Sequence, residues 1–330
     1  MANEVMKLFS KMLKNISLPL LNRRFQRIAV VIIPLFLSGC AAFNYTNTDA
    51  PVALRLEQIA PLQPAPRIAL VLGSGGPRGY AHLSILKALE DAGIVPDIII
   101  GSSVGALIGT FWADGLNAAQ LTEQALSGGP LTLFDPNPFA DRGWIRGERL
   151  QRYVESQLKN GQRLEQLPRR VVVVATERPS TPSATPKEAR YFLQGNAAVA
   201  VRASAAVMGI VSPVGILGTE YEDADESLPV AVNVARRLGA QFVIAVDVSA
   251  LPGSTPPEAA ESMRKRDIAR AARIAPETSK ADFILHPDLG YYASPRRSYF
   301  LQSLALGETY AKSQIPALQV RLKQLAPQPD

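Results

Sequence analysis

Two glycine-rich stretches hold the residues best suited to covalent chemistry. The stretch "GSSVG" (101–105) joins an apolar strand-like run to an apolar helix-like one. It matches the G-x-S-x-G pattern of a strand–turn–helix elbow, and that register selects Ser103 over Ser102 as the exposed hydroxyl. Gly101 and Gly105 let strand and helix close up around the turn, and a helix N-terminus favours an alkoxide by up to about 2 kcal/mol. The pattern predicts a nucleophilic serine.

The other stretch, "GSGGPRG" (73–79), also follows an apolar run and opens a helical segment. It lacks the third glycine of a dinucleotide fingerprint, because that place is Arg78, and it lacks the lysine of a phosphate-binding P-loop. Adjacent glycines at Gly75 and Gly76 can turn successive N–H groups toward one point, and a guanidinium adds positive potential. An anion-binding loop fits every residue, whereas the alternative is a tight turn whose glycines only allow close packing.

A partner base is harder to choose, because the chain has two histidines, His82 and His286. His286 ends the apolar run "DFILH", and the order Ser103, Asp223, His286 matches the chain order of a hydrolase triad. His82 lies three residues beyond the glycine loop and is expected to pack locally. The histidines are far apart and there is a single cysteine, so we expect neither a metal site nor a cofactor.

The elements that position these residues follow from hydrophobic runs. Five short apolar runs bounded by turn residues read as buried parallel strands: 67–72, 97–101, 171–175, 242–248 and 282–286. The segments between and after them read as helices: 80–92, 104–114, 149–159, 229–238, 258–274 and 297–325. Alternating strands and helices predict an α/β fold with a mostly parallel sheet covered on both faces, and residues 178–190 form a surface loop. In such sheets, ligands lie at the carboxyl ends of the strands, where both glycine loops fall.

These stretches together resemble the opening of the patatin-like phospholipase family. The similarity runs from "ALVLGSGGPRGYAHLSILKALEDAGIVPDIIIGSSVGALIG" through "YFLQGNAAVAVRASAAV" to "LPVAVNVARRLGAQFVIAVDVS", which covers most of residues 67–290. The resemblance implies a three-layer sandwich and a Ser–Asp dyad in place of a triad. By matching position, Ser103 would be the nucleophile, and Gly75 and Gly76, aided by Arg78, the oxyanion hole, with Gly73, Gly101 and Gly105 as motif glycines.

The dyad aspartate is the least regular part of the match. The family has Asp-Gly-Gly or Asp-Gly-Ala before a Pro-Val, whereas this chain reads "EYEDADESLPV" (220–230). Alignment on Tyr-x-Asp selects Asp223, followed by alanine instead of glycine, and Asp225 is the alternative. Taken by itself, this acidic run is typical of a solvated surface loop. An aspartate acts as a base only if burial lifts its pKa or proton transfer is concerted with attack.

The N-terminal region reads as a targeting segment. Residues 1–39 carry six basic side chains against Glu4, and their ten-residue apolar run is too short to span a bilayer. The sequence "LSGC" ending at Cys40 resembles the lipobox of bacterial lipoproteins, which implies cleavage before Cys40 and its lipidation. We therefore expect a signal peptide over 1–39, a lipid-anchored tether over 40–66 and one hydrolase domain over 67–330.

The expected protein is a lipid-anchored serine acyl hydrolase acting on a membrane lipid or another acyl ester. Beyond residue 39 the chain has 29 basic and 28 acidic residues, so it offers no basic surface for nucleic acid. Ala41 after the cysteine points to the outer membrane, facing the periplasm. Two alternatives remain open at this stage: a degenerate envelope lipoprotein with an interaction role, and a Ser–Asp–His triad esterase using His286. The oligomeric state is unknown.

Overall fold

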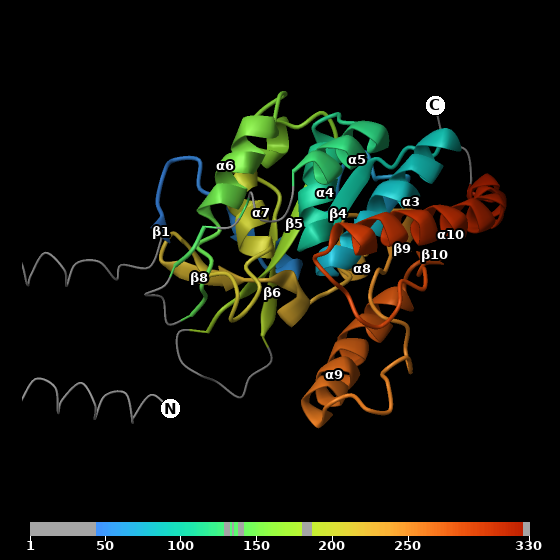
Figure 1. The fold of residues 1–330 in the computed structure, drawn as a ribbon. Helices are drawn as coiled ribbons and strands as arrows, with labels where there is room; N and C mark the ends of the chain where they lie inside the picture. The colour runs from blue at the N-terminus through green and yellow to red at the C-terminus, as the bar shows by residue number, and fades with distance from the viewer. Residues whose placement is uncertain (1–43, 129–132, 134, 138–141, 180–186, 326–330) are drawn as a thin grey trace, which may run out of the picture. The chain divides into compact units, whose positions relative to one another are not determined.

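A mixed sheet forms the centre of the fold (Figure 1). In the computed structural model, which describes residues 44–128, 133, 135–137, 142–179 and 187–325, ten strands join this sheet. The five expected strands are present and adjacent in the order β5-β4-β3-β9-β10, all parallel. Their bounds are β3 Ile68–Leu72, β4 Ile98–Ser102, β5 Arg170–Glu177, β9 Phe242–Val246 and β10 Phe283–Leu285.

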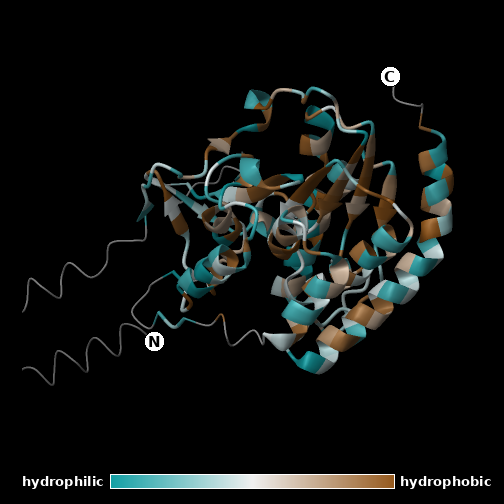
Figure 2. Cartoon of the chain, turned by 90° about the horizontal axis from the view of Figure 1, so that it is seen from above, coloured by the Kyte–Doolittle hydropathy of each residue, from teal (hydrophilic) through white to brown (hydrophobic). Residues whose placement is uncertain are grey.

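Continuous β-branched and aliphatic runs explain this parallel centre, because such strands are buried on both faces. Residues of β3 and β4 face two separate hydrophobic cores in alternation: Leu70 and Ile99 belong to one, Val71 and Ile100 to the other. Figure 2 shows the strands as a hydrophobic interior, whereas the long C-terminal helix alternates hydrophobic and hydrophilic residues. The chain is therefore a three-layer α/β sandwich, as expected.

Helices cover both faces of the sheet. The first core is formed with six of them: α3 Tyr80–Asp91, α4 Val104–Ala113, α5 Ala118–Ser127, α6 Glu148–Gln157, α7 Ala197–Ser204 and α10 Arg297–Lys323. The second core is covered by α8 Val232–Arg237, by α9 Glu261–Thr278 and by apolar side chains of residues 54–62. The sequence predicted all of these helices except α5 and α7. No helix in the part of the chain that the structure describes is both long and apolar enough to span a membrane.

Further strands extend the sheet beyond β5 through antiparallel pairs, except that β1 pairs with β7 in parallel, and the sequence did not predict them. They are β1 Asn44–Tyr45, β2 Ala53–Leu54, β6 Glu188–Phe192, β7 Val214–Ile216 and β8 Thr219–Glu222. β6 begins inside the expected loop 178–190, of which residues 180–186 lie outside the described residues. The sheet is therefore parallel at its centre and mixed at one side.

The pairing around β5 places the end of β8 opposite the end of β4. β4 pairs with β5 as far as Val174, and β6 pairs with Val173 to Glu177, so these two strands must lie on opposite edges of β5. β8 pairs with Thr176 and Glu177, which β6 also pairs, so β8 lies on the β4 edge. Since β8 is antiparallel to β5, it runs toward the end of β4.

The structure differs from the expected tether over residues 40–66. Residues 44–66 are part of the domain: β1 pairs with β7, β2 pairs with β6, and Ile59 is only 2% exposed. These elements are two or three residues long, and their partners lie far along the chain, so no local hydrophobic periodicity predicts them. Residues 1–43, which include Cys40 and the expected signal peptide, lie outside the described residues.

A polar clamp holds this N-terminal segment in place. The Tyr45 hydroxyl donates to Asp49 Oδ1 at 2.7 Å, and Asn196 Nδ2 donates to Asp49 Oδ2 at 2.9 Å. Asn196 also caps α7 by accepting from the Val199 N–H at 3.0 Å. The clamp therefore ties the start of the domain to the helix whose other end reaches the candidate site.

Candidate functional site

Ser103 sits on a strained elbow between β4 and α4. Its φ of 54° is positive, which non-glycine residues rarely adopt and which is found most often at functional sites. A Cβ on Gly105 would lie 2.2 Å from the Leu72 carbonyl oxygen, and one on Gly101 would lie 2.4 Å from Ala106 Cα. The two glycines are thus required by close packing, as the sequence predicted.

Asp223 meets Ser103 across the junction of two strands. Ser103 follows β4 and Asp223 follows β8, whose ends face one another along the edge of β5. The Ser103 hydroxyl donates to Asp223 Oδ2 at 2.6 Å, and both residues are buried, with 6% and 3% of their surface exposed. The structure therefore brings together the serine and the aspartate that the family alignment selected.

The environment of Asp223 tunes its acidity. Burial is the largest influence and raises the pKa of Asp223 to about 7, although hydrogen bonds from the Ser103 hydroxyl and the Asp225 N–H oppose it. The Asp225 N–H donates to Asp223 Oδ1 at 2.8 Å, and the Thr176 hydroxyl donates to the Asp223 carbonyl at 2.7 Å. A carboxyl group with this pKa can both accept and return a proton near neutral pH.

Ser204 supports the elbow from α7. The Ser103 N–H donates to Ser204 Oγ at 2.8 Å, and Ser204 is fully buried at the last turn of the helix. This contact fixes the strained backbone of Ser103 against a second helix. The sequence offered no signal for it, because Ser204 lies 101 residues from its partner in an unremarkable alanine-rich segment.

The first glycine loop lies on the wall of the same cavity as Ser103. Gly76 has a φ of 52° and open space around its Cβ position, whereas a Cβ on Gly75 would lie 2.5 Å from Val248 Cγ2. A Cβ on Gly73 would also lie 2.9 Å from the Val246 carbonyl oxygen. The loop thus needs glycine for conformation at one position and for close approach at its neighbours.

His82 supports this loop from beneath. It is fully buried, and its Nε2–H donates to the Gly73 carbonyl, 2.9 Å away. Burial lowers the pKa of His82 to about 4, so the ring is neutral at physiological pH. The local packing expected for His82 is what the structure has.

Arg78 lines the cavity, but its side chain is held by the chain itself. Its guanidinium Nη2 donates to the Tyr291 carbonyl oxygen. Burial lowers the pKa of Arg78. In this arrangement Arg78 braces the glycine loop against the segment before α10, and its charge reaches the cavity from that wall.

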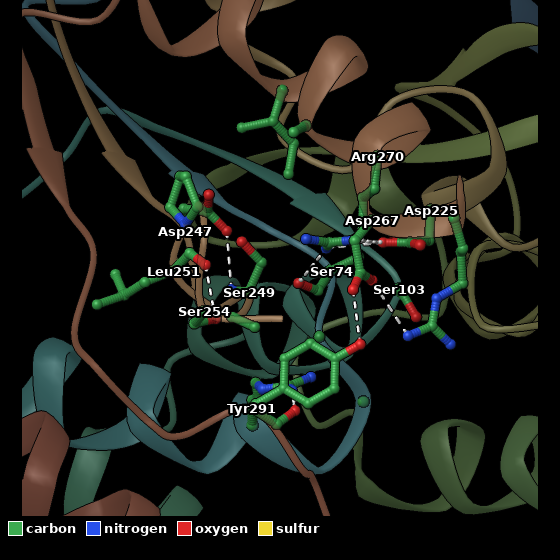
Figure 3. A pocket seen from close by; sticks show the side chains of 18 of the residues that line it. Ser74, Ser103, Asp225, Asp247, Ser249, Leu251, Ser254, Asp267, Arg270 and Tyr291 are labelled. Atoms are coloured by element: carbon green, nitrogen blue, oxygen red, sulfur yellow. Dashed lines mark hydrogen bonds and ion pairs between the residues drawn. The ribbon is translucent and has the colours of Figure 1, made fainter. Parts of the chain in front are cut away.

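Asp225 has partners that distinguish it from Asp223. Its Oδ1 accepts from the Ser74 hydroxyl and from Arg270 Nε, the latter at 2.8 Å, and Arg270 Nη2 also donates to Ser74 Oγ at 3.0 Å (Figure 3). Burial opposes ionisation of Asp225, but the Arg270 charge holds its pKa below the ordinary value. Asp225 thus links the glycine loop to α9 as an ionised carboxylate. Sequence reasoning missed Ser74 and Arg270, because only the fold brings them together.

His286 lines the cavity without joining the Ser103–Asp223 pair. Its Nε2 lies 3.1 Å from the Ser249 carbonyl and its Nδ1 lies 3.7 Å from Asp247 Oδ2. Among the described residues, its polar partners do not include Ser103 or Asp223. The triad alternative is therefore not the arrangement that the structure shows.

The cavity in front of the pair has a volume of about 810 Å³. Its walls come from both glycine-loop residues and α9, and they include exposed apolar side chains such as Val207, Met208 and Ile268. Among the described residues, no group of three or more histidine, cysteine, aspartate or glutamate side chains is placed to hold a metal ion. The space can admit a large apolar substrate to Ser103.

Known proteins resemble this chain in sequence and fold. An uncharacterized NTE family protein of Mycobacterium tuberculosis is 32% identical over 206 residues, covering 61% of this chain and 53% of that protein. A lysophospholipase of Coccidioides immitis is 27% identical over 215 residues, covering 64% of this chain and 13% of that protein. The chain thus spans about half the length of the first relative and far less of the second.

The structure of VipD from Legionella pneumophila matches with a TM-score of 0.50 at 12% identity, covering 86% of this chain and 73% of that one, which shows a shared fold. A family model described as patatin-like phospholipase matches residues 70–225. The matched span holds both glycine loops, Ser103 and Asp223, and it confirms the resemblance stated from the sequence. Residues 70–225 of the chain therefore match the patatin-like phospholipase family.

Proposed function

We propose that this protein is a serine acyl hydrolase that cleaves lipid acyl esters with a Ser103–Asp223 dyad. The observation that carries the proposal is the 2.6 Å contact between Ser103 Oγ and Asp223 Oδ2. A general base must lie within hydrogen-bond reach of the proton that it removes, and it works best with a pKa near the operating pH. The buried Asp223, with its pKa raised to about 7, meets both conditions.

In the proposed reaction, Ser103 Oγ attacks the ester carbonyl carbon while Asp223 takes the hydroxyl proton. The tetrahedral intermediate places its negative oxygen at the N–H groups of Gly75 and Gly76, each such donor being worth about 3 kcal/mol. Collapse of the intermediate breaks the ester bond, and the proton on Asp223 passes to the departing alcohol. Water then attacks the acyl-serine while Asp223 takes a proton from it, and as the acyl–oxygen bond breaks Asp223 returns that proton to Ser103 Oγ and the acid is released.

The lipid nature of the substrate is supported by the match to the family model and by the cavity. Members of this family act in general on lipid esters, and one relative is named a lysophospholipase. The cavity of about 810 Å³ with exposed apolar side chains suits an acyl chain better than a small polar ester. Rates of hydrolysis measured on phospholipid, lysophospholipid and neutral ester distinguish these three substrate classes.

The alternative of a degenerate envelope lipoprotein with an interaction role is motivated by Ala224, which follows the aspartate where the family has glycine. Ala224 is fully buried in the second core at the start of the short helical turn Ala224–Glu226, so its methyl group is accommodated by the packing. The Ser103–Asp223 contact is intact beside it. These observations favour the enzyme.

Labelling with a fluorophosphonate probe tests the proposal. We expect the wild-type protein to be labelled and Ser103→Ala to be unlabelled, while Ser102→Ala, its matched neighbour, keeps the label. Circular dichroism confirms that each variant is folded. Absence of label on folded wild-type protein would refute a hydrolase and favour the interaction role.

We further propose that Cys40 is lipidated and anchors the protein in the bacterial envelope, in the outer membrane facing the periplasm. The support is the "LSGC" sequence and the fact that Cys40 is the single cysteine of the chain. Stable anchoring takes more than one acyl chain, which lipoprotein modification provides. Cys40→Ser should move the protein from the membrane fraction to the soluble fraction, and unchanged fractionation would contradict lipidation.

A further inference from the structure

Four large apolar side chains stand exposed beside the mouth of the cavity. We call them the apolar rim, and their exposed fractions are 66% for Trp144, 39% for Val207, 54% for Met208 and 47% for Ile210. Single exposed apolar residues are common on protein surfaces, but a contiguous group next to a site usually marks an interaction surface.

The rim is one structural unit built from two chain segments. The Trp144 indole N–H donates to the Gly209 carbonyl at 3.0 Å, which holds the ring against the turn after α7. The two segments are also joined through their backbones, since the Ile145 N–H donates to the Ile210 carbonyl at 2.9 Å and the Ser212 N–H donates to the Ile145 carbonyl at 2.8 Å. The four side chains therefore belong to one hydrogen-bonded unit and present one surface.

This surface continues into the site. Val207, Met208 and Ile210 line the cavity that also holds Ser103 and Asp223. The rim is also tied directly to the site, because the Asp223 N–H donates at 3.0 Å to the carbonyl of Ala206, the residue before Val207. From α9, Ile268 adds a further apolar side chain to the cavity wall and is 70% exposed. An acyl chain leaving the rim would thus meet apolar surface on its way to Ser103.

Several polar groups of the rim make their hydrogen bonds within the protein. The only polar atom of the Trp144 side chain is bonded to Gly209, and the turn closes on itself, with the N–H groups of Ile210 and Val211 both donating to the Val207 carbonyl at 2.9 and 2.8 Å. A segment can enter an apolar layer only if its hydrogen bonds are made internally. Tryptophan, like tyrosine, is moreover enriched at membrane–water interfaces.

We propose that the apolar rim inserts into the surface of a lipid bilayer and opens the cavity onto it. The proposal rests on the proposed function, because a water-insoluble ester must pass from its bilayer to Ser103. A bilayer fits better than a partner protein, since the rim leads into the cavity and a protein seated on it would block the route of the substrate.

The two tryptophans of the chain make the proposal measurable. Trp112 is buried, with 1% of its surface exposed, whereas Trp144 is 66% exposed in the rim. The full-length protein is reconstituted into phosphatidylglycerol–phosphatidylethanolamine vesicles, with and without bromine on the acyl chains, which quenches tryptophan by contact. We expect brominated vesicles to remove most of the Trp144 emission. Trp144→Phe should abolish the difference between the two vesicle types, leaving the emission of Trp112.

Substitutions in the apolar rim test docking while leaving Cys40 and the Ser103–Asp223 pair unchanged. Ile210→Glu and Met208→Glu should restore emission in brominated vesicles to its unbrominated level, whereas Val95→Glu should leave quenching intact. Val95 is a matched control because it is 61% exposed but precedes β4, at the opposite end of that strand from Ser103.

Two results would overturn the inference. One is unquenched Trp144 in vesicles that hold the protein. The other is Trp144 emission that depends on protein concentration without lipid, which would make the rim an interface between copies of the chain. Hydrolysis of a water-soluble short-chain ester, measured on the same preparation, reports on the proposed function separately. Protein that hydrolyses the ester while Trp144 stays unquenched would refute the docking surface and leave the proposed function intact.

Discussion

Replacing Asp223 by asparagine should make the protein more stable above neutral pH while abolishing its activity. The carboxyl group of Asp223 is buried, and burial raises its pKa from 3.8 to about 7. Above pH 7 the folded protein must therefore hold a charge in a place that disfavours it. Asparagine has nearly the same shape and no charge, so it removes this cost together with the base.

The size of the effect follows from linkage between protonation and folding. Each unit of pKa difference between the folded and unfolded states corresponds to about 1.4 kcal/mol of free energy. The shift of Asp223 from 3.8 to about 7 thus corresponds to a loss of about 4 kcal/mol in the free energy of unfolding. This loss is absent below pH 3.8, where both states are protonated, and grows as pH rises to about 7.

Thermal unfolding of wild type and Asp223→Asn at several pH values tests this reasoning. We expect the variant to unfold at a higher temperature at pH 8, by roughly 10 °C at most. The difference should shrink toward zero as pH falls below 3.8, because the wild-type carboxyl group then becomes neutral in both states.

Asp225→Asn is the matched control, two residues away with the opposite expectation. Asp225 is ionised beside Arg270, whose side chain is only 15% exposed, so neutralising it should lower the free energy of unfolding at pH 8 by about 2 kcal/mol. A destabilised Asp223→Asn variant at pH 8, resembling Asp225→Asn, would refute the claim that the Asp223 charge is held at a cost.

Three further outcomes follow from the site. The kcat/KM of the wild type on a soluble ester should rise with pH through a midpoint near 7, because Asp223 must be ionised to take the proton, and a flat profile down to pH 5 would count against Asp223 as the base. His286→Ala should retain most of its turnover, and a complete loss with intact folding would revive the triad. Gly105→Ala should lower the unfolding temperature and activity together, since its Cβ would lie 2.2 Å from the Leu72 carbonyl and overpacking costs about 1–3 kcal/mol; an unchanged melting curve would contradict that geometry.

The parallel centre of the fold could be predicted because each strand carries its own signal. The runs in β3, β4 and β5 are continuous and apolar, and glycine residues mark the turns that follow β3 and β4. The part of the sheet beyond β5 has no such signal. β7 and β8 are three and four residues long, and β1 and β2 are two, so their pairing is decided by distant partners.

The candidate site divides in the same way. Ser103 could be chosen from its motif, since the glycines that shape the elbow are its sequence neighbours. Asp223 needed the family alignment, because a run of acidic residues carries no mark of which one is buried. The fold distinguishes them: β8 ends at Glu222 and delivers Asp223 to Ser103, while Asp225 turns toward Arg270. Arg270 and Ser204 act through contacts that no local pattern encodes.

The position of β1 changes what lipidation at Cys40 would mean. Pairing of the sheet begins at Asn44, so three residues separate the two, and a fully extended chain covers at most about 14 Å from Cys40 to Asn44. An enzyme lipidated at Cys40 would have a linker too short to let its domain reach substrates in the periplasm away from the membrane. It would act on lipids of the leaflet that holds it, where its substrate is present at a high effective concentration. The acids and lysolipids that it released would accumulate around its own anchor.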